Sequence, residues 1–245
     1  MKPKSVKSFI RSIIRTLGYD IHKVHGPEPG ADPFYDMRNL AGARPGHLIF
    51  DVGANVGQTI GYFRHSFEKP IIHSFEPNRT AFSELQDRCS GIEGVYLNNF
   101  ALGAEVGRLE LLENAYSELS SFLEPGVDGG GTVTRHSPIT VETIDNYCIK
   151  NRISCIDILK SDTQGFDLEV LKGAKRLLMN HRIHLVYMEI TFSEMYKNSP
   201  KLDEIYAFLT NHGFVLVTFY KFYYQNGRAG WTDALFINPK FVCHP

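Results

Sequence analysis

The feature that most constrains the fold is a short apolar strand that runs into a glycine-rich turn and then into a helix. Leu48, Ile49 and Phe50 form the strand, and residues 51–57 form the turn. Apolar residues then recur at spacings of 4, 3 and 4, which places them on one face of a helix. They are Val56, Ile60, Phe63 and Phe67. A strand–turn–helix unit of this kind predicts an α/β domain.

The alternation of strand and helix continues along the chain. Apolar strands are expected at residues 71–75, 95–102, 155–160 and 184–190, and amphipathic helices at residues 80–88, 166–178 and 202–209. Buried strands that alternate with helices predict a mainly parallel sheet with helices on both faces. Two late strands, residues 214–220 and 234–238, lie close enough to form an antiparallel hairpin and bring the expected sheet to seven strands.

The chain divides into an N-terminal amphipathic helix and linker, residues 1–46, and an α/β domain, residues 47–245. Residues 1–17 have the pattern of a basic amphipathic helix, which either caps the domain or makes weak contact with an anionic membrane surface. Within the domain, residues 115–138 are polar and contain the run Asp128–Gly131. Such a stretch is expected to be irregular, and to act as a lid or a substrate loop.

Charge and cysteine usage narrow the choice of function and location. The chain has 26 Lys and Arg against 27 Asp and Glu, a net charge of -1, so no basic field favours nucleic acid. No apolar run approaches the roughly 20 residues of a membrane span, and no signal peptide is evident, which predicts a cytoplasmic protein. The cysteines show no metal-ligand spacing and are expected to be unpaired thiols of a reducing compartment. They are Cys89, Cys148, Cys155 and Cys243.

The turn after the first strand carries the first candidate binding residues. Gly53 and Gly57 permit a tight turn and a close approach of the backbone to a ligand. The pattern differs from the G-x-G-x-x-G of nicotinamide enzymes, because Asp51 precedes the glycines. Its carboxylate would repel a pyrophosphate and attract a cofactor with an ammonium and a sulfonium group. A nicotinamide-dependent oxidoreductase on a similar sheet remains the alternative.

The ends of the second and third strands carry the next candidates. Glu76 follows Gly57 by 19 positions. An acidic residue about 20 positions beyond such glycines binds ribose hydroxyls in dinucleotide-binding folds. Near the end of the third strand, Asn99, Phe100 and Ala101 suit the edge and face of an adenine ring.

A third group of candidates ends the fourth and fifth strands. Lys160 and Asp162 are two positions apart, so they point to the same side of a strand, with Lys160 deeper. Glu189 ends the neighbouring strand. Two carboxylates at adjacent strand ends suggest a general base, a metal site or both. Alternatively, Lys160 and Asp162 form an internal ion pair that holds the strand end.

These motifs as a set resemble the FkbM family of methyltransferases. The resemblance covers roughly residues 47–238 and rests on residues 50–57, 75–77, 101–103, 159–165 and 169–174, then Glu189 and residues 233–236. It implies a Rossmann-like class I methyltransferase sandwich with S-adenosylmethionine as the cofactor. It also implies methyl transfer to a hydroxyl of a sugar, a glycan or glycolipid, or a polyketide-like natural product. The resemblance makes Asp51, Gly53, Asn55 and Gly57 the loop at the methionine end of the cofactor, and Glu76 its ribose ligand.

Departures from the commoner form of the family bear on metal binding and on the reaction. Gln164 and Asp167 stand where many members have Glu. Because an amide at Gln164 takes the place of a carboxylate that could bind a metal ion, no metal is predicted. Asp162 is expected to be the general base that takes the proton of the acceptor hydroxyl, with Glu189 and Lys160 tuning or positioning it.

Other parts of the sequence leave alternatives open. His136 is a second candidate base. Substrate selection is expected to involve residues 115–138 and a C-terminal aromatic run, although aromatic residues in a hairpin are equally typical of packing. The run comprises Phe219, Tyr220, Phe222, Tyr223 and Tyr224, together with Trp231. A membrane-surface module that keeps the fold without catalysis is a further alternative, and the sequence carries no prediction of oligomeric state.

Overall fold

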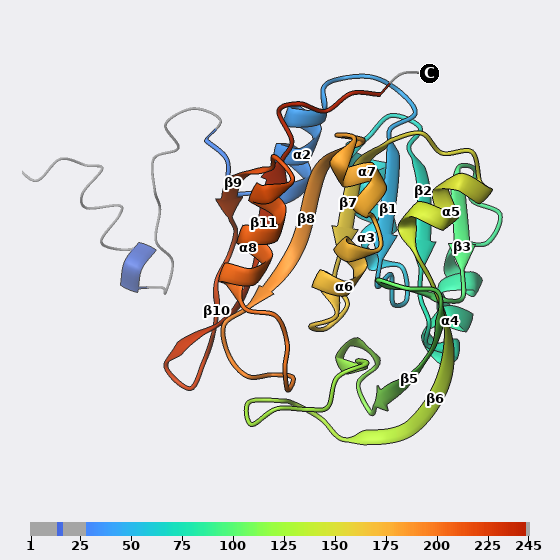
Figure 1. Ribbon diagram of the computed structural model, residues 1–245. Helices are drawn as coiled ribbons and strands as arrows, with labels where there is room; N and C mark the ends of the chain where they lie inside the picture. Colours follow the sequence, from blue (N-terminus) through green and yellow to red (C-terminus); the bar gives the residue numbers. More distant parts are fainter. Residues whose placement is uncertain (1–13, 17–27, 244–245) are drawn as a thin grey trace, which may run out of the picture.

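The computed structural model describes residues 14–16 and 28–243, so the predicted amphipathic helix over residues 1–17 lies almost wholly outside it (Figure 1). The domain has a central sheet with helices on both faces and a second, smaller sheet beside it. The strands are β1 (Leu48–Val52), β2 (Ile71–Phe75), β3 (Val95–Asn98), β4 (Ala101–Leu102), β5 (Gly107–Asn114), β6 (Val133–Glu142), β7 (Ile156–Ser161), β8 (Ile183–Thr191), β9 (Val215–Phe219), β10 (Tyr223–Gln225) and β11 (Arg228–Ile237). The helices are α2 (Pro33–Ala41), α3 (Gln58–Ser66), α4 (Arg79–Cys89), the 3-10 helix η1 (Ser117–Leu119), α5 (Ile144–Lys150), α6 (Asp167–Lys172), α7 (Lys175–Met179) and α8 (Leu202–Asn211). Within the described part of the chain, none of the helices is both long and apolar enough to cross a membrane.

The central sheet is parallel apart from its last strands. β2 and β3 follow β1 on one side, β7 and β8 follow it on the other, and these neighbours are all parallel. β11 pairs antiparallel with β8, and β9 and β10 both pair antiparallel with β11. The predicted antiparallel pairing of the late strands is confirmed, but the sheet has 8 strands rather than the expected seven. The extra strand, β10, folds back onto β11 through Asn226 and Gly227, whose φ angles of 52° and 74° suit a tight hairpin turn.

The strand order reverses between β1 and β7. The chain passes from β1 to β2 and β3, and later returns to the opposite side of β1 as β7. In open α/β sheets, ligands bind beyond the carboxyl ends of the strands at such a reversal. The topology therefore places the candidate residues of β1, β2, β7 and β8 along one edge of the sheet.

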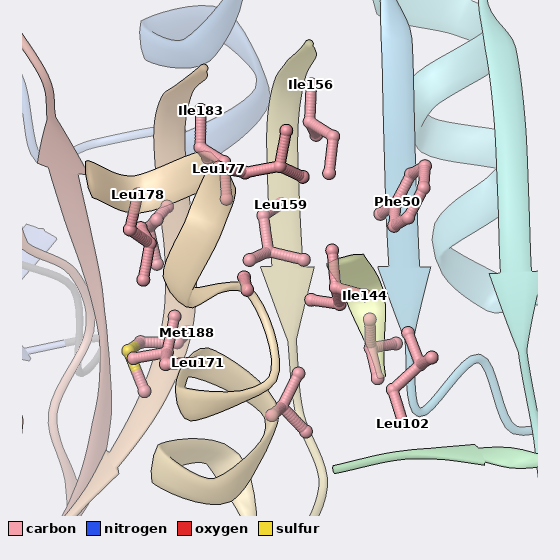
Figure 2. Packing of buried hydrophobic residues seen from close by; sticks show 14 of the residues in the cluster. Phe50, Leu102, Ile144, Ile156, Leu159, Leu171, Leu177, Leu178, Ile183 and Met188 are labelled. Atoms are coloured by element: carbon pink, nitrogen blue, oxygen red, sulfur yellow. The ribbon is translucent and has the colours of Figure 1, made fainter. Parts of the chain in front are cut away.

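Side chains of the central strands alternate between two apolar cores, one on each face. Phe50 and Leu159 point into the core beneath α5, α6, α7 and α8, where they pack with Ile144 and Met188 (Figure 2). Ile49 points into the opposite core, which α2, α3 and α4 cover. Burial on both faces explains why these strands are continuous apolar runs rather than alternating ones.

Helix α2 lies inside the segment that was expected to be a linker. The Asp32 carboxylate caps it by accepting hydrogen bonds from the N–H groups of Phe34 and Tyr35. Met37 is fully buried in the core, and the Tyr220 hydroxyl donates to Asp36. Helix α2 thus packs on the α/β domain ahead of the predicted boundary.

The second sheet departs from the predicted pattern. The strand expected over residues 95–102 ends at Asn98, and β4 leaves the central sheet to pair with β6. β6 also pairs with β5 along most of its length. The irregular stretch expected over residues 115–138 therefore ends where β6 begins, at Val133. We call residues 115–132, which join β5 to β6, the cover.

The single helix expected over residues 166–178 is divided into α6 and α7. A Cβ atom on Gly173 would lie 2.1 Å from the main-chain oxygen of Gly103, so the chain packs too closely there for any other residue. The Asp145 carboxylate accepts hydrogen bonds from Arg176 and Leu177 N–H groups, at 2.6 and 3.1 Å, and caps α7. Helical periodicity does not report such tertiary contacts.

Two cysteines correct the expectation of unpaired thiols. Cys155, just before β7, forms a disulfide with Cys243, which is 88 positions later. Cys89 and Cys148 are free and buried, as expected. The fold brings the paired residues together, with Cα atoms 5.6 Å apart, and their spacing in the sequence gives no sign of it.

Candidate functional site

A pocket opens at the carboxyl ends of β1, β2 and β7, where the strand order reverses. It encloses about 660 Å³ of space between the atoms, including its open mouth. The strand ends form its floor, and part of the cover closes it from above. The lining residues are Val52, Gly53, Asn55, Phe75, Glu76, Pro77, Ala101, Leu102, Leu111, Ser117, Glu118, Ser120, Ser121, Phe122, Asp162, Thr163, Gln164 and Phe166.

Gly53 lets three strand ends meet in the floor. Its φ is +74°, and a Cβ atom there would lie 1.9 Å from the main-chain oxygen of Asp162. Its N–H donates to the carbonyl of Phe75 at 3.0 Å, and the N–H of Asp162 donates to the carbonyl of Val52 at 3.1 Å. Only glycine accommodates both the positive φ and the close approach.

Asn55 and Gly57 shape the same turn in different ways. Asn55 lines the pocket with a φ of 45°, and its N–H donates to Oε2 of Glu76 at 2.8 Å. Gly57 is not among the lining residues. It has a φ of +89°, and a Cβ atom there would lie 2.8 Å from Cδ1 of Leu85. Gly57 therefore allows α3 to start close to α4.

Glu76 faces the pocket from the end of β2. Its Oε1 accepts a hydrogen bond from the N–H of Asn78, and its Oε2 accepts one from Asn55, both at 2.8 Å. The residue is only 7% exposed, and burial raises its pKa to about 7 in spite of these hydrogen bonds. Each carboxylate oxygen retains acceptor capacity for a ligand hydroxyl.

Asp51 and Lys160 lie beneath the pocket rather than in its lining. They are buried in register on neighbouring strands, with Lys160 Nζ 3.0 Å from Asp51 Oδ1. Lys160 also donates to the carbonyl of Gly53 at 2.9 Å. Burial is the largest influence and opposes the charged ammonium, but the carboxylates of Asp51, Asp162 and Asp167 together outweigh it and raise the pKa of Lys160. The ion pair expected between Lys160 and Asp162 thus forms with Asp51 instead, because Asp51 is the directly adjacent residue on β1.

Only one of the three residues predicted to contact adenine lines the pocket. Ala101 does so from the start of β4. Asn99 is exposed, and its side-chain amide donates to the carbonyl of Glu76 at 2.8 Å. Phe100 packs against the core, with its ring centroid 5.7 Å from that of Phe75. The break between β3 and β4 turns these two side chains away.

Asp162 lines the pocket from the end of β7 and is oriented by a chain of hydrogen bonds. Gln164 Nε2 donates to Asp162 Oδ1 at 2.8 Å, and the Tyr196 hydroxyl donates to Gln164 Oε1 at 2.8 Å. Asp167, which is buried behind this loop, accepts from the Ser161 hydroxyl at 2.5 Å. Of the two departures from the commoner family pattern, Gln164 therefore orients Asp162 directly, and Asp167 bonds to Ser161 behind the loop.

Glu189 belongs to the acidic group around Asp162 but does not line the pocket. It lies on β8, half-buried and directly opposite Asp233 of β11. Burial, and then the charges of Asp162, Asp167 and Asp233, raise the pKa of Glu189 well above its usual range. Burial likewise raises the pKa of Asp233, whose Oδ2 accepts from the Tyr187 hydroxyl at 2.8 Å.

The first part of the cover closes over the floor through a few side-chain contacts. The Ser117 hydroxyl donates to Asn55 Oδ1 at 3.1 Å, and the Ser121 hydroxyl donates to the carbonyl of Gln164 at 2.7 Å. The rings of Phe122 and Phe166 have centroids 4.9 Å apart. The cover is thus joined to the turns that follow β1 and β7.

The second part of the cover is held at Asp128, which is buried. Its carboxylate accepts hydrogen bonds from Arg228 at 3.0 Å, and from Asn226 and the N–H of Glu194 at 3.2 Å. Gln225 donates to the main-chain oxygen of Asp128 at 2.8 Å. The tip of the cover is therefore bonded to the β10–β11 hairpin.

Several pocket residues were not predicted from the sequence. Leu111 of β5 is one of them, whereas Ser117 and Phe122 were predicted only as part of the stretch 115–138, the expected lid or substrate loop. For Gln164 the sequence did hold a signal, because this residue differs from the Glu that many family members have at the same position. The alternative base His136 lies on β6, exposed, with Nδ1 3.1 Å from Oε2 of Glu110. Among residues 14–16 and 28–243, no group of three or more His, Cys, Asp or Glu is arranged to hold a metal ion.

Comparisons with known proteins point to one family. Residues 51–216, more than half of the chain, match the family described as Methyltransferase FkbM domain. The chain is 24% identical to 2-O-methyltransferase NoeI of Sinorhizobium fredii over 181 residues, which cover 66% of this chain and 70% of that protein. It is 25% identical to 31-O-demethyl-FK506 methyltransferase FkbM of Streptomyces tacrolimicus over 211 residues, which cover 74% and 77%. A solved structure of a putative rRNA methylase from Clostridium thermocellum aligns with a TM-score of 0.48 at 8% identity, over 99% of this chain and 100% of that one.

The residues of the pocket are compatible with the cofactor of this family. Glu76 offers acceptors to ribose hydroxyls, apolar walls that include Phe75 and Leu102 suit an adenine ring, and Gly53 keeps the floor free of a side chain. Membership of a methyltransferase family argues against the two alternatives considered above, a nicotinamide-dependent oxidoreductase and a non-catalytic module. The chain belongs to the FkbM family and is an S-adenosylmethionine-dependent methyltransferase.

Proposed function

We propose that this enzyme methylates a hydroxyl of a sugar, a glycan or glycolipid, or a polyketide-like natural product. The observation that carries the proposal is the Asp162 carboxylate, which lines the pocket at the reversal of strand order and is oriented by Gln164. The two relatives support a hydroxyl acceptor, since both are named for methylation at oxygen.

The proposed chemistry requires alignment and removal of one proton. An alcohol is a poor nucleophile, so a positioned base assists it as the new oxygen–carbon bond forms. The bound cofactor supplies the methyl group. The Gln164 amide donates a hydrogen bond to Oδ1 of Asp162, so Oδ2 is the oxygen that accepts the proton of the acceptor hydroxyl. Glu189, whose raised pKa favours the neutral acid, lies beside Asp162 and tunes or positions that base without adding a second negative charge.

Lys160 acts as a positioning residue in this scheme. Its ammonium links the Asp51 carboxylate to the carbonyl of Gly53 and does not line the pocket. Removing its charge would leave Asp51 buried without compensation, which is strongly destabilising in proteins. Loss of Lys160 is therefore expected to lower stability and cofactor binding together.

The test is a methyl-transfer assay with isotopically labelled S-adenosylmethionine and a panel of sugars, glycolipids and polyketides. The proposal predicts label on an oxygen of one of these classes, located by mass spectrometry and NMR. Label found only on nitrogen or carbon, or only on RNA added to the same panel, would contradict it.

We further propose that residues 33–243 form one catalytic domain and that the cover acts as its lid. The support is that α2 packs on the domain and that the cover closes the pocket with its first part. Shortening the glycine run 129–131 is expected to raise the KM of the acceptor more than the Kd of the cofactor. Equal changes in both would contradict a role in acceptor selection.

The cytoplasmic location and the weak membrane contact of residues 1–17 also remain proposals. The disulfide offers a direct test of the first, because a reducing compartment keeps cysteines as thiols. Rapid alkylation of intact cells, followed by mass spectrometry, is expected to label Cys155 and Cys243. If both escape labelling until a reductant is added, the enzyme resides in an oxidising compartment.

The proposed membrane contact of residues 1–17 is tested by flotation with anionic vesicles, using the protein with and without these residues.

A further inference from the structure

A row of carboxylates leads from the pocket toward the β10–β11 hairpin. Ser161 pairs with Met188 and Glu189 pairs with Asp233, so Asp162, Glu189 and Asp233 lie side by side on three adjacent strands. Their mutual effect on the pKa of Glu189 agrees with this proximity. The row therefore extends the site of the proposed base across β8 to β11.

Two stacked aromatic rings stand at the far end of this row. Trp231 precedes Asp233 by two positions on β11, so both side chains point to the same face. The ring of Tyr223 stacks on Trp231 with centroids 5.1 Å apart and planes inclined by 8°. Trp231 is half-buried and Tyr223 is 40% exposed. The pair, with Lys221 Nζ 4.8 Å from the centre of the Tyr223 ring, is thus a partly exposed aromatic surface at the active-site edge of the sheet.

This combination of groups fits a carbohydrate. The C–H face of a sugar ring packs on an aromatic ring, and carboxylates accept hydrogen bonds from sugar hydroxyls. From the spacing of strands and residues in a sheet, Trp231 lies on the order of 12 Å from Asp162. That separation exceeds the width of one sugar ring. A ring stacked on Trp231 is therefore the neighbour of the ring whose hydroxyl meets Asp162.

We propose that Trp231 and Tyr223 form a subsite for the second sugar ring of a glycan acceptor, with Glu189 and Asp233 binding hydroxyls between the two rings. The inference rests on the proposed function and names the substrate class within it. The enzyme then prefers a disaccharide or longer glycan to a monosaccharide, and the aromatic pair provides that preference.

Fluorescence tests the subsite without any need for turnover. Trp231 is the only tryptophan of the chain, so its emission reports on this surface alone. The probes are methyl glucoside, galactoside and mannoside and the disaccharides maltose, lactose and mannobiose, added to enzyme saturated with S-adenosylhomocysteine. At least one disaccharide is expected to change the emission saturably, with a Kd about tenfold below that of its monosaccharide.

Variants of the hairpin test the same subsite through kinetics. Tyr223→Ala and Trp231→Ala are expected to raise the KM of the preferred disaccharide about tenfold and to leave the monosaccharide KM and the cofactor Kd unchanged. Trp231→Phe keeps an aromatic face and should restore most of the preference, which guards against a misfolded alanine variant. Tyr224→Ala is the matched control, since Tyr224 is 73% exposed and it is the neighbouring Tyr223 that stacks on Trp231.

The outcomes separate this inference from the proposed function. Saturable emission changes with a disaccharide support the subsite even if no hydroxyl in the whole panel is methylated, and in that case the proposed function fails alone. Methylation of sugars with no disaccharide preference, or with a preference that survives Trp231→Ala, overturns the subsite and leaves the proposed function standing. An emission that no sugar changes, together with methylation of polyketides only, also overturns it.

Discussion

The floor of the pocket and its cover are built in different ways. The floor is made of strand ends and one tight turn, joined by backbone hydrogen bonds and by the positive φ of Gly53. The cover is attached by side chains, above all through Asp128 and Arg228, which are 100 positions apart, and by backbone hydrogen bonds to Leu112 and to the loop 194–197. The floor is thus an integral part of the sheet, whereas the cover is bonded to its surface.

The difference has a consequence for dynamics. Moving the floor would break the register of the central strands, which are buried on both faces. Opening the cover breaks contacts between loops, such as the hydrogen bonds of Ser117 and Asp128 and the backbone bonds to residues 194–197, and leaves the pairing of the central strands intact. Segments with few buried contacts open locally without global unfolding. We therefore expect a rigid floor and a cover that opens to exchange ligands.

The largest effect is expected from a substitution in the floor. Gly53→Ala would place a Cβ atom 1.9 Å from the backbone of Asp162 at a φ of +74°, so the strand ends must separate. We expect a loss of about 3 kcal/mol in the free energy of unfolding and at least about a hundredfold weaker cofactor binding. Calorimetry and chemical denaturation measure both.

Gly61→Ala is the matched control for this substitution. Gly61 lies in α3, and a Cβ atom there would meet nothing within 4 Å. Alanine favours a helix over glycine, so this variant should be equally or more stable and bind cofactor normally. A Gly53→Ala variant that behaves like Gly61→Ala would show that the floor is less rigid than described.

A smaller loss of cofactor affinity is expected when an uncharged residue replaces Glu76. Glu76→Gln removes a charged acceptor from the floor, which should weaken cofactor binding by about tenfold to a hundredfold. Calorimetric titration at pH 8 with the methylated cofactor and its demethylated product gives the Kd. An unchanged Kd for both ligands would remove Glu76 from the binding site.

The pH dependence follows from the same residue. The pKa of Glu76 is raised to about 7, so the carboxylate gains a proton as the pH falls from 8 to 6 and cofactor affinity should fall with it. Between its usual value of 4.5 and about 7 the folded protein holds a proton that the unfolded chain releases, so Glu76 lowers the stability of the ligand-free domain as the pH rises. In Glu76→Gln both dependences should flatten.

The smallest of these effects is expected from the cover. Asp128→Ala removes the acceptor shared by Arg228, Asn226 and the N–H of Glu194, which should speed cofactor release about tenfold with little change in global stability. Stopped-flow displacement of cofactor measures the rate. The control, Glu124→Gln, breaks an exposed ion pair with Lys197 on the same segment and should have almost no effect. Equal release rates in the two variants would mean that Asp128 does not hold the cover.

The same contrast explains what the sequence could and could not predict. Residues of the floor such as Gly53 and Glu76 follow apolar strands at regular spacing, so local pattern and strand order are enough to place them. Contacts made between distant segments have no such pattern. The pairing of Lys160 with Asp51, the bond between Tyr196 and Gln164, and the disulfide depend on which strands become neighbours.

Errors in predicted elements have the same origin. The expected third strand ends early because Asn99 bonds to carbonyls of the turn after β2, and the expected helix over residues 166–178 breaks where Gly173 meets Gly103. In each case a tertiary contact overrides a local preference that periodicity reports correctly.

The central claim, that Asp162 is the base of an oxygen methyltransferase, is tested most directly by Asp162→Asn with the acceptor identified in the panel assay. The amide keeps the size of the side chain but cannot accept the hydroxyl proton. The account predicts that kcat falls by about a hundredfold to ten-thousandfold while the Kd of S-adenosylmethionine changes by less than about threefold. A variant that keeps full kcat, or that loses activity only because it no longer binds the cofactor, would contradict the claim.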